Sequence, residues 1–189
     1  MEYTIGNNKI GKDTIIINIT SSTDCASARL GLCNVVANGK MWSCYAYRPE
    51  RFRPDCLPFR QRQAQQWDDE SVAEIAHQLN RVIDSTRRKT KIKWVRFSES
   101  GDFRHQADAD KMSKLADLLH VPLYGYTARH DLNFVRRSPN IAINGSGFMV
   151  DNKFTARKAL TSKIVCPGNC RHCHICKLPR GADIQVKLH

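Results

Sequence analysis

Residues 92–128 read IKWVRFSESGDFRHQADADKMSKLADLLHVPLYGYTA, and this stretch decides the fold. The segment 92–98 is short and rich in β-branched and aromatic residues, which predicts a strand. Apolar residues then recur at helical spacing and predict a helix over about 106–120, which Pro122 ends. The segment 123–128 predicts a second strand. A strand, a helix and a strand in succession favour a parallel pair joined by a right-handed crossover.

The same alternation extends in both directions along the chain. Upstream, residues 14–20 read TIIINIT and predict a buried strand. The acidic start DDES at 68–71 precedes apolar residues at helical spacing, which predicts a helix over about 69–88. Downstream, NIAINGS at 140–146 predicts a further strand, and IQVKLH at 184–189 predicts a last edge strand.

These elements predict an α/β fold, either a small partial barrel or an open, mostly parallel sheet with helices, plus a cysteine-rich C-terminal extension. The chain has 189 residues, whereas a full eight-fold barrel usually needs ~200 or more. We therefore predict a single domain over 1–189. Within it, 21–58 is expected to be a cysteine-rich loop without clear period, and 162–189 a cysteine-rich C-terminal segment.

Composition and charge narrow the class of protein. The chain is 41% hydrophobic and 25% charged, which is typical of a soluble globular protein. No stretch approaches the ~20 apolar residues of a membrane span, and no signal-peptide core follows Met1, so we predict a cytoplasmic protein without a membrane partner. The net charge of +12, concentrated at 48–62, at 87–93 and at Arg136 and Arg137, favours nucleic acid or another polyanion as a partner. The alternative is a solvated basic surface. The sequence does not indicate an oligomeric state.

The segment CPGNCRHCHIC at 166–176 carries the strongest chemical signal. Its spacing is Cys166-x3-Cys170-x2-Cys173-x2-Cys176, and disulfides are rare in a reducing compartment, so the cysteines favour a metal. Four thiolates in closely spaced runs are typical of iron–sulfur clusters, here a [4Fe-4S] cluster. Zinc is the main alternative, since tetrahedral sites also take four cysteines, or three and a histidine such as His172 or His174. If the protein were exported, disulfides would be the alternative.

Four further cysteines lie upstream, at Cys25, Cys33, Cys44 and Cys56. Each alone could be a small buried hydrophobe. Four in one aperiodic segment favour a common role, because a metal could organise so long a loop. They predict a second metal site, or a share in one centre with the C-terminal cysteines.

Polar residues follow several predicted strands, and parallel strands present their carboxyl ends at one edge, where ligands bind in open α/β sheets. A small molecule could therefore bind there. The alternative is that each side chain serves a turn or the core, for example Asp102 as a helix N-cap. No catalytic residue can be assigned. The candidate substrate-binding residues at this edge are Glu99, Ser100, Gly101, Asp102, Tyr126, Arg129 and Asn144.

The order of these features resembles a group of bacteriophage proteins, the gene product 88 family. The matching segments are IINIT at 16–20, the cysteine loop ending in CYA at 44–46, VRFSESGDF at 95–103, LYGYTA at 123–128 and CPGNCRHCHIC. The resemblance covers most of the chain. It implies a phage origin, the cytoplasm of an infected bacterium as location, and an α/β fold with cysteine-bound metal. It implies no particular reaction.

The layout is also similar to a reduced radical SAM enzyme. In such enzymes a cysteine loop after the first strand holds a four-iron cluster, and a later strand ends in a glycine- and acid-containing loop. Cys25, Cys33 and Cys44 follow the first long strand here, and the loop 98–102 follows the next one. This resemblance implies S-adenosylmethionine as a cofactor. The spacing C-x3-C-x2-C, however, occurs at 166–173 and not in the N-terminal loop.

Three hypotheses of function follow. The first is an iron–sulfur protein that is redox-active or binds a small molecule at the strand ends. The second is a basic, nucleic-acid-associated protein with a structural zinc or iron–sulfur site. The third is a radical SAM-like enzyme.

Overall fold

The computed structural model describes residues 1–33, 36 and 41–187, and it contains one eight-stranded sheet. The strands are β1 (Thr4–Ile5), β2 (Thr14–Ile17), β3 (Trp94–Phe97), β4 (Leu123–Thr127), β5 (Ile141–Ser146), β6 (Asn152–Arg157), β7 (Ile164–Val165) and β8 (Asp183–Lys187). The helices are α1 (Ala26–Arg29), α2 (Tyr47–Phe52), α3 (Cys56–Asp69), α4 (Val72–Ile83) and α5 (Gln106–Leu118), with short 3-10 turns η2 (Met41–Ser43) and η3 (Ile175–Lys177). None of the described helices is long and apolar enough to cross a bilayer.

The sheet is open and mostly parallel, which confirms the predicted fold class. Its order is β1-β2-β3-β4-β5-β6-β8-β7, and only β1 is antiparallel to its neighbour. Strands β2 to β6 therefore lie side by side in chain order, as they do in barrels. The prediction that the C-terminal strand is an edge strand is wrong, because β8 pairs with β6 on one side and with β7 on the other.

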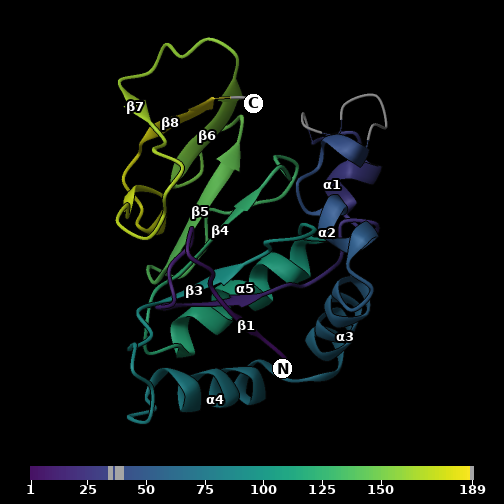
Figure 1. The fold of residues 1–189 in the computed structure, drawn as a ribbon, viewed down its shortest axis with the longest axis vertical. Helices are drawn as coiled ribbons and strands as arrows, with labels where there is room; N and C mark the ends of the chain where they lie inside the picture. The colour runs from purple at the N-terminus through teal and green to yellow at the C-terminus, as the bar shows by residue number, and fades with distance from the viewer. Residues whose placement is uncertain (34–35, 37–40, 188–189) are drawn as a thin grey trace.

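The sheet has two unequal parts, which differ in their position relative to the helices (Figure 1). Helices α3, α4 and α5 gather around the β1–β4 part, while β6, β7 and β8 extend away from them. The C-terminal segment, yellow in Figure 1, folds back beside β5. This arrangement leaves one face of the sheet to the helices and the other to the chain that follows β7.

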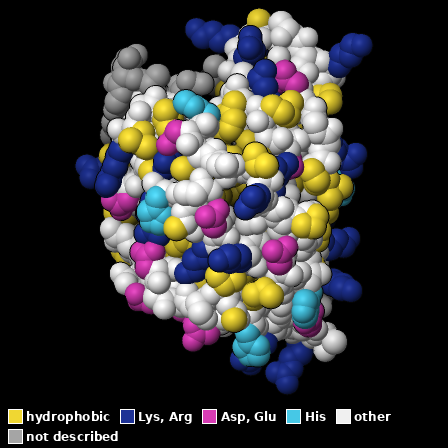
Figure 2. Space-filling model, turned by 180° about the vertical axis from the view of Figure 1, so that it is seen from behind, with side chains coloured by type: hydrophobic (Ala, Val, Ile, Leu, Met, Phe, Trp, Pro, Cys, Tyr) yellow, Lys and Arg dark blue, Asp and Glu magenta, His cyan; other side chains and the backbone are white. Residues whose placement is uncertain are grey.

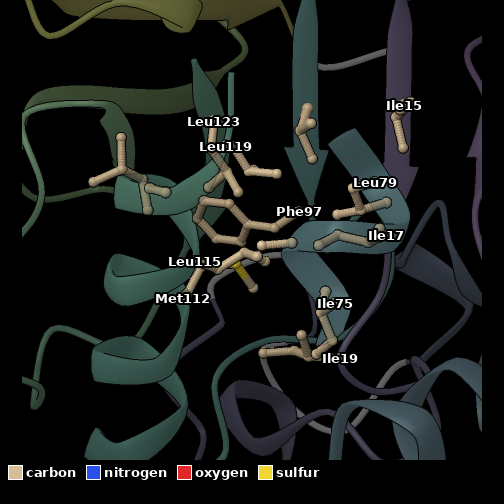
Figure 3. Packing of buried hydrophobic residues seen from close by; sticks show 14 of the residues in the cluster. Ile15, Ile17, Ile19, Ile75, Leu79, Phe97, Met112, Leu115, Leu119 and Leu123 are labelled. Carbon is tan, nitrogen blue, oxygen red and sulfur yellow. The ribbon is translucent and has the colours of Figure 1, made fainter. Parts of the chain in front are cut away.

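The helix-covered face holds the apolar core. Ile15 and Ile17 of β2 and Phe97 of β3 are fully buried there against helix residues such as Leu79 and Met112 (Figure 3). Successive strand residues point to opposite faces, so the alternation places these side chains together. Each such burial contributes about 1.5–3 kcal/mol relative to an exposed side chain.

The opposite face, here called the aromatic face, is more polar. By the strand register it carries Trp94, Arg96, Tyr124, Tyr126 and Asn144. Trp94 and Tyr124 meet edge to face with ring centroids 6.5 Å apart. Arg96, a charged residue within the parallel strand β3, therefore lies on this polar face and not in the apolar core.

The long aperiodic segment 21–58 is not one loop. Helices α1 and α2, the turn η2 and the start of α3 organise its described part. Helix α3 was not foreseen, because the residues it buries are Arg60, Gln63 and Trp67, two of them polar. The helix expected over 69–88 is α4 alone. It begins after Ser71, which forms a reciprocal capping box with Glu74.

Candidate metal centre

The segment 166–177 lies across the aromatic face. The side-chain amide of Asn144 donates to the carbonyls of Cys176 and of Gly125, each at 2.9 Å. The ring of His174 stacks on Trp94 with centroids 5.5 Å apart. At the segment's start, the Cys166 amide donates to the Gln185 carbonyl of β8 at 2.7 Å. The cysteine-rich segment is thus attached at both ends to the sheet, and Asn144, a predicted ligand-binding residue, holds it in place.

The four thiols of this segment are close enough to influence one another. The pKa of Cys176 is raised to about 11, mainly by burial; a hydrogen bond with the Tyr126 hydroxyl lowers the pKa, and negative charge on Cys166, Cys170 and Cys173 raises it. The pKa of Cys170 is also raised, first by burial, then by Cys166. Tyr126, another predicted site residue, therefore contacts this cysteine group.

The donor set fits a thiolate-bound metal in its chemistry and in its half-buried position. All four cysteines are free and partly exposed, so an ion could reach them. Within the described residues, however, no three His, Cys, Asp or Glu side chains stand in a coordinating arrangement. The four sulfur atoms would therefore have to move together on metal binding, as is common when a site forms around its ion. His174 is engaged by Trp94, which favours the four thiols as ligands.

The N-terminal cysteines form a separate group. Burial raises the pKa of Cys25 to about 12, with smaller contributions from Asp102 and Cys33. Burial also raises the pKa of Cys44, again with a contribution from Cys33. Cys33 thus lies near both other thiols. Cys56 instead begins helix α3, and no interaction found among the described residues joins it to the other three.

These three cysteines lie beside the carboxyl ends of β2 and β3, where a buried carboxylate organises the loops. Glu50 accepts hydrogen bonds from the amide and hydroxyl of Ser22, from Ser100 Oγ at 2.6 Å and from Arg60 at 2.6 Å. Burial alone would raise the pKa of Glu50, but the bonds from Ser100, Ser22 and Arg60 outweigh it, and the pKa is lowered. Ser100, a predicted ligand-binding residue, is thus used within the fold.

Asp102 occupies a similar position in the next loop. Its carboxylate accepts from Ser27 Oγ at 2.5 Å, from its neighbour's amide at Phe103 and from the Ala128 amide at 2.7 Å. Burial raises its pKa despite these bonds. The expectation of an N-cap role is wrong, because His105 is the N-cap residue of α5. Asp102 instead joins the ends of β3 and β4 to α1.

The remaining predicted edge residues are also held by the fold. Gly101 has φ +72°, and a Cβ there would collide with Thr20, so the close approach of the two loops requires glycine. Arg129 pairs with Asp131 and donates to the Phe103 carbonyl at 2.6 Å. Glu99 accepts from the Tyr45 hydroxyl through its carbonyl at 2.5 Å. These contacts do not test whether a ligand binds, so the substrate-binding role of these edge residues stays a prediction.

Two cations of the aromatic face were not foreseen. Lys177, next to Cys176, is 2% exposed, and its Nζ lies 5.1 Å from the Trp94 ring centroid. The Arg96 guanidinium lies 5.5 Å from the Tyr126 ring centroid and donates to the Tyr45 hydroxyl at 3.3 Å. The only signal in the sequence is a charge inside a strand and a lysine at the end of the cysteine run.

The basic surface is less continuous than the sequence suggests. Arg60, within the basic stretch 48–62, is buried in an ion pair with Glu50, and Arg137 pairs with Asp151. Figure 2 shows Lys and Arg side chains spread over one face and interspersed with acidic and hydrophobic ones. A nucleic-acid partner stays a prediction.

Fold and site together define an α/β protein that packs a four-cysteine segment on one face of a sequentially ordered, mostly parallel sheet. The family model described as Gene product 88 matches residues 2–148, and the chain belongs to this family. The match confirms the resemblance to this family, which rested in part on motifs within 16–128, and does not support the resemblance to radical SAM enzymes. It covers β1 to β5 and ends before Cys166, so the cysteine segment lies outside the matched region. Comparison with curated proteins and with solved structures gave no match.

Proposed function

We propose that this protein is an iron–sulfur protein whose cluster is held by Cys166, Cys170, Cys173 and Cys176 on the aromatic face of the sheet. The observation that carries the proposal is that Cys166, Cys170 and Cys173 lie near enough to act electrostatically on Cys176, in a segment tied to the sheet through Asn144. Four thiolates are the usual ligand set of such clusters. When bound, the cluster would supply one-electron chemistry.

Iron is favoured over zinc by the density of the cysteines. Four within eleven consecutive residues leave only two or three residues between neighbours. Structural zinc sites usually combine two cysteine or histidine pairs across a longer loop. Cluster-binding runs use the closer spacing found here.

Metal analysis of protein purified without oxygen tests the proposal. We expect brown protein with broad visible absorption, and iron with acid-labile sulfide in about equal amounts, near four of each per chain. Colourless protein with stoichiometric zinc would refute the iron–sulfur assignment. Cys170→Ser or Cys173→Ser should abolish cluster retention, whereas Cys56→Ser, the matched control outside both cysteine groups, should leave it unchanged.

A second candidate is radical SAM-like chemistry at the N-terminal cysteines. It is favoured by the grouping of Cys25, Cys33 and Cys44 beside the loop 98–102, at the carboxyl edge where ligands bind in open α/β sheets. Three thiols would leave one position of a metal centre open to a ligand. The test is reductive cleavage of S-adenosylmethionine by the reduced protein, with Cys33→Ser as the inactive variant. Failure of the reduced, iron-loaded protein to cleave it removes this candidate.

A further inference from the structure

Lys177 and Arg96 place two buried positive charges beside the C-terminal cysteines, and neither forms an ion pair among the described residues. The Nζ of Lys177 and the Nε of Arg96 are buried, and neither has a hydrogen-bond partner among the described residues. A buried charge without a partner costs several kcal/mol, so such groups are normally paired. Both atoms therefore indicate that something anionic belongs near them.

The carboxylates of the fold do not supply this partner. The ion pairs found among residues 1–33, 36 and 41–187 include neither Lys177 nor Arg96. Asp13 acts on Lys177 more strongly than Cys170 and Cys173 do, and Glu99 acts on Arg96, but neither carboxylate forms an ion pair with its cation among the described residues. The rings of Trp94 and Tyr124, 5.1 and 5.8 Å from Lys177 Nζ, stabilise an ammonium only partly.

The thiols of the segment are among the groups that act on these cations and can become anionic. Cys170 and Cys173 act electrostatically on Lys177, and Arg96 acts on Cys170. While the cysteine side chains are neutral thiols, they supply no negative charge to compensate Lys177 and Arg96. Once a metal binds, the four cysteines are thiolates, and together they outweigh the charge of a divalent ion or of a cluster core of the same charge. The loaded centre is therefore an anion next to two buried cations.

We propose that Lys177 and Arg96 are positioning residues that hold the loaded cysteine centre by charge, and that they make the metal-free form less stable. This inference rests on the proposed function, since it concerns the same four cysteines. The hydrocarbon stem of Lys177 packs in the buried interior, so methionine can replace the stem while removing the charge. Arginine at the same position keeps the charge.

The experiment compares wild type with Lys177→Met, Arg96→Met and Lys177→Arg. The exposed control is Lys158→Met, which makes the same change in net charge as Lys177→Met. Each anaerobically loaded protein is titrated with a chelator, and the metal-free forms are melted separately. For Lys177→Met we expect an apparent metal affinity about 10–100-fold lower, as for other residues that support metal ligands. Its metal-free form should melt at the same or a higher temperature, because an unpaired buried charge is gone.

A charge role for Lys177 predicts that Lys177→Met lowers the metal affinity but does not lower the melting temperature of the metal-free form. A packing role predicts a lower melting temperature. Lys177→Arg should bind metal as wild type does, and Lys158→Met should match wild type in both measurements. For an iron–sulfur centre, the reduction potential of Lys177→Met should also be lower, because the added electron loses a nearby positive charge.

Each contrary result has a distinct meaning. Wild-type protein without stoichiometric metal refutes the proposed function itself. If wild-type protein holds metal, and Lys177→Met and Arg96→Met both bind it as tightly as wild type does, only the inference is overturned. A lower melting temperature in the metal-free Lys177→Met, without rescue by Lys177→Arg, assigns the residue to packing and also overturns it.

Discussion

Glu50 is the residue on which the loops at the carboxyl edge depend most. It receives hydrogen bonds from the loops after β2 and β3, and it is the buried partner of Arg60. Glu50→Gln should lower the free energy of unfolding at pH 7 by about 3–5 kcal/mol, because Arg60 loses its compensating charge. Glu2→Gln, which breaks an exposed pair with Arg62, should cost less than about 1 kcal/mol. Urea denaturation measures both.

The same residue predicts a pH dependence. The folded pKa of Glu50 is lower than its ordinary value of 4.5, so its contribution to stability is complete above that value. It is lost as the pH falls through the folded pKa. The gap in unfolding free energy between wild type and Glu50→Gln should therefore shrink below about pH 4.5. A gap that stays constant down to pH 3 would contradict the assigned role.

Gly101 allows a second test on single residues. Gly101→Ala introduces both an unfavourable φ and a collision with Thr20. Gly181→Ala introduces only the first, because φ is +64° there and a Cβ would meet nothing within 4 Å. Thermal unfolding should show Gly101→Ala to be less stable by about 1–3 kcal/mol more than the control. Equal losses would mean that the loops after β2 and β3 can move apart.

Helix α4 shows how the sequence fixes an element locally. The capping box at Ser71 satisfies amides that the first helical turn leaves free. Ser71→Ala should destabilise the protein by about 1 kcal/mol. Thr86→Ala, an exposed position beyond the end of the same helix, should be nearly neutral. Chemical denaturation followed by circular dichroism compares the two, and a neutral Ser71→Ala would mean that packing alone determines where the helix begins.

Elements with a clear hydrophobic period were predictable, and the others were not. Strands β2 to β5 and helices α4 and α5 present apolar residues at the spacing of their own structure. Helix α3 does not, since its buried side includes Arg60 bound to Glu50 and Gln63 bound to Asn18. Such a helix becomes recognisable only once its polar partners, distant in sequence, are known.

The candidate site divides in the same way. The spacing within CPGNCRHCHIC is local, so the four cysteines could be grouped from sequence. The contact of Lys177 with Trp94 and the hydrogen bond from Asn144 to Cys176 join residues far apart in the chain, so they could not be predicted from local spacing. The separation of Cys56, which begins α3, from the other upstream cysteines likewise depends on the tertiary structure.

For the whole molecule, metal should stabilise one region more than the rest. The segment 166–177 is joined to the sheet by few hydrogen bonds, while α4 and α5 pack into the main core. Removing the metal should therefore increase hydrogen exchange of amides in 166–177 and leave those of α4 and α5 unchanged. Uniform loss of protection would show that the centre supports the entire fold, and no change would argue against a metal at these cysteines.

The sheet ends on both sides in strands of two residues, β1 and β7. A strand so short exposes few free backbone groups along its outer side, and long exposed edges are what another chain needs to add a strand. The β-sheet is therefore poorly suited to grow by recruiting neighbours. Even at high protein concentration, this geometry closes the most direct backbone route to fibre-like aggregates.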